Sequence, residues 1–283
     1  MHAFARAGGQ PPEPHPGVRW LTVELLDRDA VRRALDATRP SIIYHCAGLA
    51  HVQDAWKAPA RSLRVNVLGT HHLLEGCREL GLTCRMLVTG SAQIYRPHTE
   101  PIAEDDDIAP ANPYGVSKLA QELTAAASGL PVLLARPFNH AGPRQSPAYA
   151  SSAFAQQIAQ IESGRREPVL RVGNLDARRD LTDVRDTVRA YLALADSGVP
   201  LRPYNVCSGR AHSMREILDL LLSMARVRVA IEVDPARMRP ADTPIVLGSH
   251  ARLTADTGWR PEIPLEQTLS DLLDYWRARE AQP

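Results

Sequence analysis

Short apolar runs alternate with longer amphipathic segments through the first 137 residues of the chain. The runs that we interpret as buried strands lie at residues 2–6, 18–23, 41–46, 86–88 and 131–136. The segments between them carry apolar residues three and four positions apart, as amphipathic helices do, and lie at residues 29–38, 58–80 and 112–128. Strands that alternate with helices predict an α/β fold with a parallel, doubly wound, Rossmann-like sheet.

The pattern changes after Pro137. Loops rich in Pro, Gly, Asn and Arg are broken by shorter periodic segments at residues 153–163 and 214–225. We expect a sheet domain over residues 1–137, to which part of the later chain returns, and a smaller lobe formed mainly by residues 138–283. Two such lobes predict a cleft at the carboxyl ends of the strands, where open α/β sheets bind their ligands.

The composition excludes several classes of function. The 33 basic and 32 acidic residues leave no field of one sign, so we expect no nucleic-acid and no membrane partner. No run approaches the ~20 apolar residues of a membrane span, and the first residues lack the apolar region of a signal peptide. The cysteines have no C-x-x-C spacing, and the histidines lack the spacing of a metal site. We therefore expect a soluble, cytoplasmic protein without a metal.

The strongest chemical signal comes from Ser91, Tyr114 and Lys118. Ser91 follows a strand, so its hydroxyl is expected at the carboxyl edge of the sheet. Tyr114 and Lys118 are four residues apart in a helix that begins near Asn112, so they share one face. A Lys cation lowers the pKa of a nearby phenol from its usual ~10, which lets the phenol exchange a proton with an oxygen that Ser91 hydrogen-bonds. A Tyr-x-x-x-Lys pair alone is common on exposed helices, but the serine at the strand end favours a catalytic role.

These residues, in this order of strand and helix, resemble the extended short-chain dehydrogenase/reductase family. The stretch His45-Cys46-Ala47-Gly48 resembles the segment that lines the cofactor in this family, and Asn66-Val67-Leu68-Gly69-Thr70 resembles its N-V-x-G-T helix. Three later segments narrow the resemblance to the group of GDP-mannose 4,6-dehydratases and GDP-4-dehydro-6-deoxy-D-mannose reductases. They lie at residues 136–143, 173–175 with 178–180, and 239–242. Residues 258–261 resemble the G-W-x-P element that is common near the end of nucleotide-sugar enzymes of the family.

The resemblance implies a dinucleotide cofactor bound by the sheet domain. Besides Tyr114 and Lys118, the residues implied for this site are Arg6, Glu24, Leu25, Ala47, Gly48, Asn66 and Phe138. NAD-selective folds place Asp or Glu at the end of the strand that residues 2–6 resemble. This chain has Arg6 there, and a cation accommodates a 2'-phosphate. We therefore expect NADP, with NAD as the alternative.

The resemblance also implies a nucleotide-sugar substrate. Its diphosphate needs permanently charged, bidentate partners, which Arg179 and Arg239 could supply, and its ribose diol suits a carboxylate such as Asp242. Further substrate contacts are implied for the amides Gln93, Asn139 and Asn174. Without the resemblance we would interpret each of these arginines as a solvated surface charge.

The expected reaction is reduction of a C4 keto group, from GDP-4-dehydro-6-deoxy-D-mannose to GDP-D-rhamnose. Dehydratases of this group carry Thr-x-Glu, whose Glu removes the C5 proton, whereas this chain has Ser91-Ala92-Gln93, and an amide cannot act as that base. A 4-epimerase, a 4,6-dehydratase and a truncated, non-catalytic sugar-nucleotide-binding member stay open as alternatives. The resemblance further implies a homodimer through a four-helix bundle of the helices at 58–80 and 112–128, although their apolar stripes equally suit packing on the sheet.

The sequence contains no G-x-x-G-x-x-G loop. In the family, a strand, this loop and a helix come before the strand that residues 2–6 resemble, and the loop binds the pyrophosphate through backbone amides. The missing strand belongs in the middle of the sheet, so its two neighbours would face each other with unpaired backbone groups. We expect either a truncated version of a longer protein or a variant that has lost cofactor binding. Residues 1–283 should then bind NADP weakly or not at all and be poorly stable, which a strong NADPH-dependent shift in a thermal melt would refute.

Overall fold

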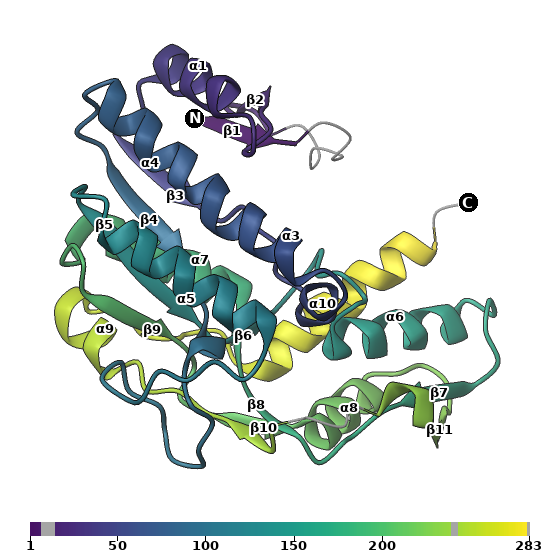
Figure 1. The fold of residues 1–283 in the computed structure, drawn as a ribbon. Helices are drawn as coiled ribbons and strands as arrows, with labels where there is room; N and C mark the ends of the chain where they lie inside the picture. The colour runs from purple at the N-terminus through teal and green to yellow at the C-terminus, as the bar shows by residue number, and fades with distance from the viewer. Residues whose placement is uncertain (7–14, 239–242, 282–283) are drawn as a thin grey trace. The chain divides into compact units, whose positions relative to one another are not determined.

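The computed structural model describes residues 1–6, 15–238 and 243–281. These residues belong to two compact units (Figure 1). The first unit consists of Met1–Arg96, Ile108–Arg136 and Leu194–Pro203, and the second of Pro97–Asp107, Pro137–Ala193 and Tyr204–Pro283. Two of the predicted substrate residues, Arg239 and Asp242, lie outside the described residues.

Parallel strands form the centre of the first unit. β4 (Arg85–Thr89) lies between β3 (Ile42–His45) and β5 (Val132–Pro137), and it pairs in parallel with both. Met86 of β4 stands opposite Ile43 on one side and Val132 on the other, so apolar side chains run across the sheet. Near-continuous apolar runs are typical of parallel sheets that are covered on both faces. The predicted α/β class with a parallel sheet is therefore confirmed.

Two helices of the first unit lie along this sheet. They are α4 (Gly69–Glu79) and α5 (Pro113–Ala126), which lie side by side along the strands, and α1 (Arg28–Thr38) packs against α4 (Figure 1). Fully buried apolar side chains from the helices and from β4 and β5 meet in one cluster, which includes Val31, Leu35, Leu73, Cys77, Met86, Val88, Val132 and Leu134. Burial of these side chains holds α4 and α5 against the sheet and so fixes where the strands end relative to α5.

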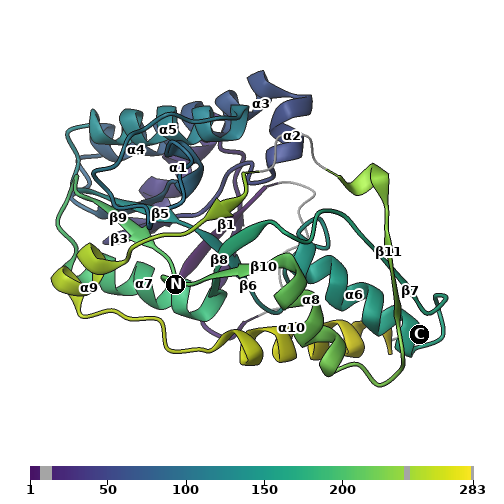
Figure 2. The same cartoon turned by 90° about the horizontal axis from the view of Figure 1, so that it is seen from below.

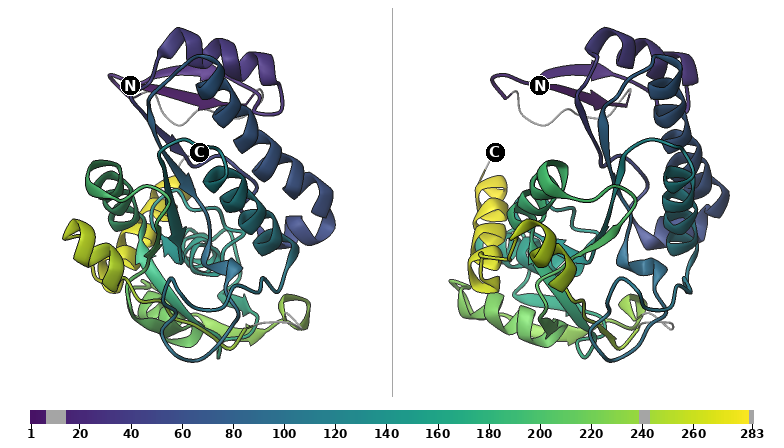
Figure 3. Two further views of the ribbon diagram at one scale, coloured as in Figure 1. Left: turned by 60° about the vertical axis from the view of Figure 1, so that its left-hand side comes forward. Right: turned by 90° about the vertical axis from the view of Figure 1, so that its left-hand side faces the viewer.

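The first two strands form a sheet of their own. β1 (His2–Ala5) and β2 (Arg19–Thr22) pair in parallel, and α1 lies beside them (Figure 3). Among the described residues neither strand pairs with β3. Ile42 and Tyr44 of β3 are each 40% exposed, although an inner strand of a parallel sheet is normally buried on both faces. This break agrees with the predicted absence of the first strand–helix unit of the fold.

The helix predicted over residues 58–80 is confirmed, with a π-helical turn inside it. α2 (Val52–Lys57) precedes it, and α3 (Pro59–Leu63), the π turn at Arg64–Leu68 and α4 follow one another without a gap in right-handed helical backbone. A proline fits the first turn of a helix better than its interior, which explains why α3 begins at Pro59. The π turn carries the fully buried Asn66. Such turns are frequent at functional sites.

A layer of three helices forms the core of the second unit. α6 (Ala150–Glu162), α8 (Met214–Ser223) and α10 (Leu265–Glu280) pack against one another (Figure 2). Their buried apolar side chains belong to one cluster, with Phe154, Ile158, Leu170, Ile217, Leu218, Leu221, Leu269, Leu272 and Trp276 among its members. This unit therefore has a hydrophobic core of its own.

Small sheets complete the second unit. β8 (Arg178–Asp183) pairs with β6 (Asn139–Ala141), β10 (Ala211–Ser213) and β12 (Ile245–Val246), whereas β7 (Val169–Val172) pairs with β11 (Ala230–Val233). α9 (Ala251–Thr257) also belongs to the second unit. Two further elements, α7 (Val184–Ser197) and β9 (Pro203–Val206), each contain a boundary between the two units. Of the helices described, none combines the length and the apolar character that crossing a membrane requires.

Candidate active site

Ser91 lies just beyond the carboxyl end of β4, as the sequence predicts. It is 6% exposed, and its side-chain Oγ accepts a hydrogen bond from the backbone N of Gln93 at 3.2 Å. This bond caps a short 3₁₀ turn, Ala92–Ile94. The turn fixes the position of the hydroxyl at the edge of the sheet, and it uses a lone pair of Oγ rather than its proton.

The same turn is held against the first turn of α5. Asn112 caps α5 by accepting a bond from the backbone N of Gly115 at 2.9 Å, and its Nδ2 donates to Gln93 Oε1, also at 2.9 Å. A Cβ built on Gly115 would lie 2.3 Å from the backbone oxygen of Gln93, so only glycine permits this approach. The segment that carries Ser91 and the helix that carries Tyr114 are thereby joined at adjacent residues.

One face of α5 is almost entirely buried. Tyr114 is 8% exposed and Lys118 is 5% exposed, and Gln121, one turn further along, is fully buried. The predicted sharing of one helical face by Tyr114 and Lys118 follows from their spacing on this helix.

Lys118 reaches the carboxyl end of the sheet. Its Nζ donates to the backbone oxygen of Thr89, the last residue of β4, at 2.7 Å, and to Gln121 Oε1 at 2.8 Å. Because burial disfavours the charged form, the pKa of Lys118 falls to about 8. The amine still carries its proton at neutral pH, close to the point where it would lose it.

A chain of buried polar side chains continues from Lys118 to the end of β3. Gln121 Nε2 donates to Thr70 Oγ1 at 2.9 Å, and Thr70 Oγ1 lies 2.6 Å from the backbone oxygen of Asn66 and 2.8 Å from His45 Nε2. Burial, with a smaller effect of the Lys118 cation, lowers the pKa of His45 to about 3, so this ring is neutral at pH 7.

Gly48 and Asn66 meet beside Lys118. A Cβ on Gly48 would lie 2.7 Å from Asn66 Oδ1 and 3.8 Å from Lys118 Nζ. Asn66 Oδ1 accepts from the backbone N of Leu49 at 2.8 Å, and its Nδ2 donates to Ser117 Oγ at 2.9 Å. Three of the predicted cofactor residues are therefore brought together, and the close approach of Asn66 Oδ1 to Gly48 requires that residue 48 has no Cβ.

The other cofactor candidates of the first unit are Arg6, Glu24, Leu25 and Ala47. Within the described part of the chain, we observe no hydrogen bond from them to Gly48, Asn66 or Lys118. Arg6, Glu24 and Ala47 are exposed, and Glu24 accepts a bond from the backbone N of Leu26 at 3.2 Å. The backbone oxygen of Leu25 lies 2.8 Å from His72 Nδ1.

In the second unit the predicted residues lie on several segments. Phe138 is 4% exposed, and its ring packs so closely on Gly248 that a Cβ built there would lie 2.6 Å from it. Asn139 is exposed. Asn174 Oδ1 accepts from the backbone N of Asp176 at 2.9 Å. Arg179 donates to the backbone oxygens of Arg178 and Thr243, each at 2.8 Å.

A buried ion pair that the sequence did not suggest supports the end of β5. Arg136 donates to both carboxylate oxygens of Glu122 on α5, at 3.0 and 2.5 Å, and also to the hydroxyl of Tyr95 at 2.7 Å. Glu122 lies four residues after Lys118, so this pair fixes the third turn of α5 against the sheet. The spacing of these charges along the sequence gave no signal, because the two partners lie on different elements.

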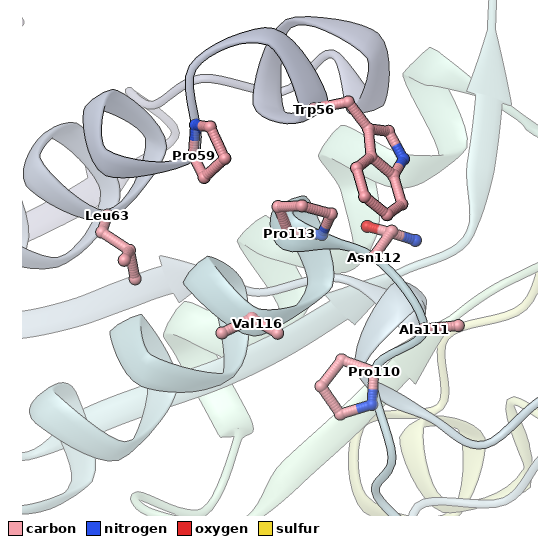
Figure 4. A pocket seen from close by; sticks show the side chains of 8 residues that line it. All are labelled: Trp56, Pro59, Leu63, Pro110, Ala111, Asn112, Pro113 and Val116. Carbon is pink, nitrogen blue, oxygen red and sulfur yellow. The ribbon is translucent and has the colours of Figure 1, made fainter.

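A shallow apolar pocket of about 330 Å³ lies beside the start of α5 (Figure 4). Trp56, Pro59 and Leu63 face Pro113 and Val116 across it, and none of the predicted catalytic residues lines it. Among the described residues, no group of three or more His, Cys, Asp and Glu side chains could hold a metal ion.

Comparison with known proteins relates the sequence and the fold of the chain to one family. A family model described as GDP-mannose 4,6 dehydratase matches residues 6–272. The chain is 42% identical over 247 residues to GDP-6-deoxy-D-mannose reductase of Pseudomonas aeruginosa, across 85% of this chain and 81% of the relative. The solved structure of RMD from Pseudomonas aeruginosa, complexed with NADPH, is 38% identical and gives a TM-score of 0.87, over 94% of this chain and 92% of that chain. The UDP-glucose 4-epimerase of Thermus thermophilus, solved with NAD, is 29% identical with a TM-score of 0.83, over 96% and 88%.

These likenesses define a Rossmann-like protein of the short-chain dehydrogenase/reductase class, so the predicted fold class is confirmed. The chain belongs to the GDP-mannose 4,6-dehydratase family, a group of extended short-chain dehydrogenases/reductases that modify nucleotide sugars.

Proposed function

We propose that this protein reduces the C4 keto group of a nucleotide sugar with NADPH, converting GDP-4-dehydro-6-deoxy-D-mannose to GDP-D-rhamnose. The observation that carries the proposal is the buried face of α5, where Lys118 is fixed at the end of β4 one turn after Tyr114. The 42% identity to a GDP-6-deoxy-D-mannose reductase supports this choice of substrate.

In this proposal Tyr114 donates its phenolic proton to the C4 oxygen, and Ser91 donates a hydrogen bond to the same oxygen. Ser91 is suited to this role because the proton of its hydroxyl is not used by the bond from Gln93. The Lys118 cation stabilises the phenolate that Tyr114 becomes. When bound, NADPH supplies the hydride to C4.

Gly48, Asn66 and Lys118 are the proposed contacts of the nicotinamide and ribose end of such a cofactor. Arg6, an exposed cation after β1, favours NADP over NAD by accommodating the 2'-phosphate, and Glu24, Leu25, Ala47 and Phe138 are further proposed contacts. For the assay we take the upper end of the usual range of KM values, ~1 mM, as the expected KM for NADPH.

The substrate is assigned mainly to the second unit. Arg179 and Arg239 would hold the diphosphate and Asp242 the ribose, while Gln93, Asn139 and Asn174 would contact sugar or base. The partners of Arg179 within the chain include backbone oxygens, which fix its direction without neutralising its charge.

Dehydration is disfavoured by the residue at position 93. Its side chain is an amide, and Oε1 already accepts from Asn112 Nδ2. A Gln in this arrangement supports the cap of α5 and cannot remove a proton from C5.

We also propose a homodimer through α4 and α5. Exposed apolar side chains on and next to these helices support it, namely Leu63, Leu68, Val116 and Leu123, of which Leu123 is 60% exposed. Light scattering should then give twice the chain mass, and Leu123→Glu should give a monomer.

The activity is tested by mixing the purified protein with NADPH, up to several times its expected KM, and GDP-4-dehydro-6-deoxy-D-mannose. We expect the absorbance of NADPH to fall in proportion to GDP-D-rhamnose formed. Tyr114→Phe should slow the reaction by ~10²–10⁴-fold. Tyr275→Phe is the matched control, because Tyr275 lies on α10 in the second unit. Equal rates for the Tyr114 variant and the wild-type protein would contradict the proposal.

A further inference from the structure

Lys118 is connected to α4 by one fully buried glutamine. Gln121 accepts from Lys118 Nζ through Oε1 and donates from Nε2 to Thr70 Oγ1, so its amide bridges two elements of the site. Both Gln121 and Thr70 are 0% exposed. An amide in this position has no water to replace either bond.

The hydrogen-bond directions in this chain follow from counting donors. Lys118 has only protons to offer, so Gln121 must present its oxygen to Nζ and its nitrogen to Thr70. The hydroxyl of Thr70 has one proton, which it donates to the backbone oxygen of Asn66. His45 must therefore donate from Nε2 to Thr70, which fixes the tautomer of its neutral ring. Every bond in the chain then has one donor and one acceptor.

We propose that Gln121 is a positioning residue for the reduction, which holds the Lys118 ammonium charged and fixes its place at the end of β4, one helical turn from Tyr114. The inference rests on the proposed function for the role of Lys118 and goes beyond it in assigning Gln121, with Thr70 and His45 behind it. A neutral acceptor is the suitable partner here. It stabilises the cation without cancelling the charge that Tyr114 needs, whereas a carboxylate would cancel it.

The geometry leaves part of Lys118 for ligand. Among the described residues Nζ has two acceptors, Thr89 O and Gln121 Oε1, for its three protons. Gly48 lies close to this group, since a Cβ built on it would be 3.8 Å from Nζ. Gln121 and Thr89 thus hold two protons inside the protein and leave the third to a bound molecule.

The groups that could titrate near Lys118 are few. His45 is the last residue of β3 and Cys46 comes directly after it, while Tyr114 lies on the same helix as Lys118. His45 stays neutral above its lowered pKa of about 3, and burial of its sulfur raises the pKa of Cys46. Glu122 is paired with Arg136. A change of charge at residue 121 should therefore change the protonation of Lys118 and Tyr114 rather than that of another group.

The chain offers a direct measurement, because it contains only two lysines, Lys57 and Lys118. Labelling lysine with ¹³C at Cε gives two NMR signals. The signal that is lost in Lys118→Met belongs to Lys118, and the signal of the exposed Lys57 serves as the internal reference. Titration of the signal of Lys118 gives its pKa without any enzymatic activity. The test therefore does not depend on whether the reductase assignment is right.

Two variants should move this pKa in opposite directions. Gln121→Met removes an acceptor from the cation and should lower the pKa of Lys118 by about one unit. Gln121→Glu places a carboxylate beside it and should raise the pKa by at least about one unit. Thr70→Val, which leaves Gln121 Nε2 without its acceptor, should lower the pKa less than Gln121→Met does.

Matched controls come from a buried glutamine of the second unit. Gln157 is 4% exposed, and its side chain bonds Ala153 O and the backbone N of Arg171. Gln157→Met and Gln157→Glu should leave the pKa of Lys118 unchanged. If both Gln121 variants left it unchanged, or moved it in the same direction, the inference would be wrong.

The activity of the same variants then separates the two proposals. The alkaline limb of the pH profile of kcat/KM should move down in Gln121→Met and up in Gln121→Glu, following the measured pKa of Lys118. Shifted pKa values in a protein without reductase activity would overturn the proposed function alone. If the variants were active and neither substitution at residue 121 shifted the pH profile of kcat/KM, the role of Gln121 alone would be overturned.

Discussion

Each unit of the molecule buries a charged side chain, and the two are satisfied differently. In the second unit, Asp180 is 0% exposed and accepts four hydrogen bonds, from Ser208 N, Ser208 Oγ, Gly209 N and Gly248 N, at 2.7, 2.6, 2.9 and 3.2 Å. In the first unit, Lys118 is 5% exposed and finds two acceptors among the described residues for three protons. The chain supplies a hydrogen-bond donor for each of about four acceptor sites of Asp180, whereas one proton of the Lys118 ammonium group has no acceptor among the described residues.

This difference separates a structural charge from one that serves a ligand. A carboxylate offers about four lone-pair sites, and Asp180 fills them with donors from two loops, which it thereby joins to β8. Burial raises the pKa of Asp180, and the hydrogen bonds from Ser208, Gly248 and Gly209 act against that rise. Burial likewise disfavours the charged form of Lys118 and lowers its pKa, so the two charges differ in how many of their bonding sites the chain fills rather than in whether burial penalises them. A protein tolerates such a cost where function requires it.

The largest effect is expected from Asp180→Ala. Four donors would lose their acceptor at once, so we expect the free energy of unfolding to fall by ~3–5 kcal/mol, as measured by urea denaturation. Asp176→Ala, at an exposed position shortly before β8, is the control and should change it by less than ~0.5 kcal/mol. A loss as small as that of the control would show that Asp180 does not hold the loops.

Lys118→Met should have the opposite effect on stability. Removing the buried cation should raise the free energy of unfolding at pH 7 by up to ~3 kcal/mol, since the pKa lies near 8 rather than 10.5 in the folded state. The same variant should lose at least ~10²-fold in reductase activity. If it unfolded more easily than the wild-type protein at pH 7, Lys118 would be a structural charge like Asp180.

The pH dependence of that gain has a defined sign. Between about pH 8 and 10.5 the unfolded wild-type chain keeps the proton of Lys118 while the folded chain has released it. The stability of the wild-type protein therefore rises with pH across this window because of this group. The advantage of Lys118→Met should shrink through the window and vanish above it, which denaturation at several pH values measures.

The smallest effects come from two helix caps, one in each unit. Asn112→Ala at α5 and Ser213→Ala at α8 should each lower the free energy of unfolding by ~1 kcal/mol. Only Asn112 also holds Gln93 and hence the turn of Ser91. Activity at saturating substrate should fall in Asn112→Ala and stay unchanged in Ser213→Ala. Equal activities would mean that the cap has no part in placing Ser91.

Local signals in the sequence predicted much of this arrangement. Apolar runs gave β3, β4 and β5, Asn112-Pro113 gave the start of α5, and the spacing of Tyr114 and Lys118 gave their common face, because each depends on residues close together in the chain. The alternation of these elements also predicted the α/β class.

Contacts between distant segments could not be predicted in this way. Thr70 and His45 were noticed only as parts of motifs, and their link to Gln121 depends on how α4, α5 and β3 meet in space. Gln121 lies three residues after Lys118, so helical spacing would have indicated a shared face for them too. The π turn at Arg64–Leu68 has no local signal, since the packing of Asn66 stabilises it.

The most direct test of the proposed chemistry follows a hydride. NADPH carrying deuterium at C4 of the nicotinamide ring, prepared separately for each face, is mixed with the protein and GDP-4-dehydro-6-deoxy-D-mannose, and the sugar product is analysed by mass spectrometry and NMR. The account predicts one deuterium at C4 of GDP-D-rhamnose from one of the two faces, with a rate that depends on Tyr114. A sugar product without deuterium from either face would contradict it.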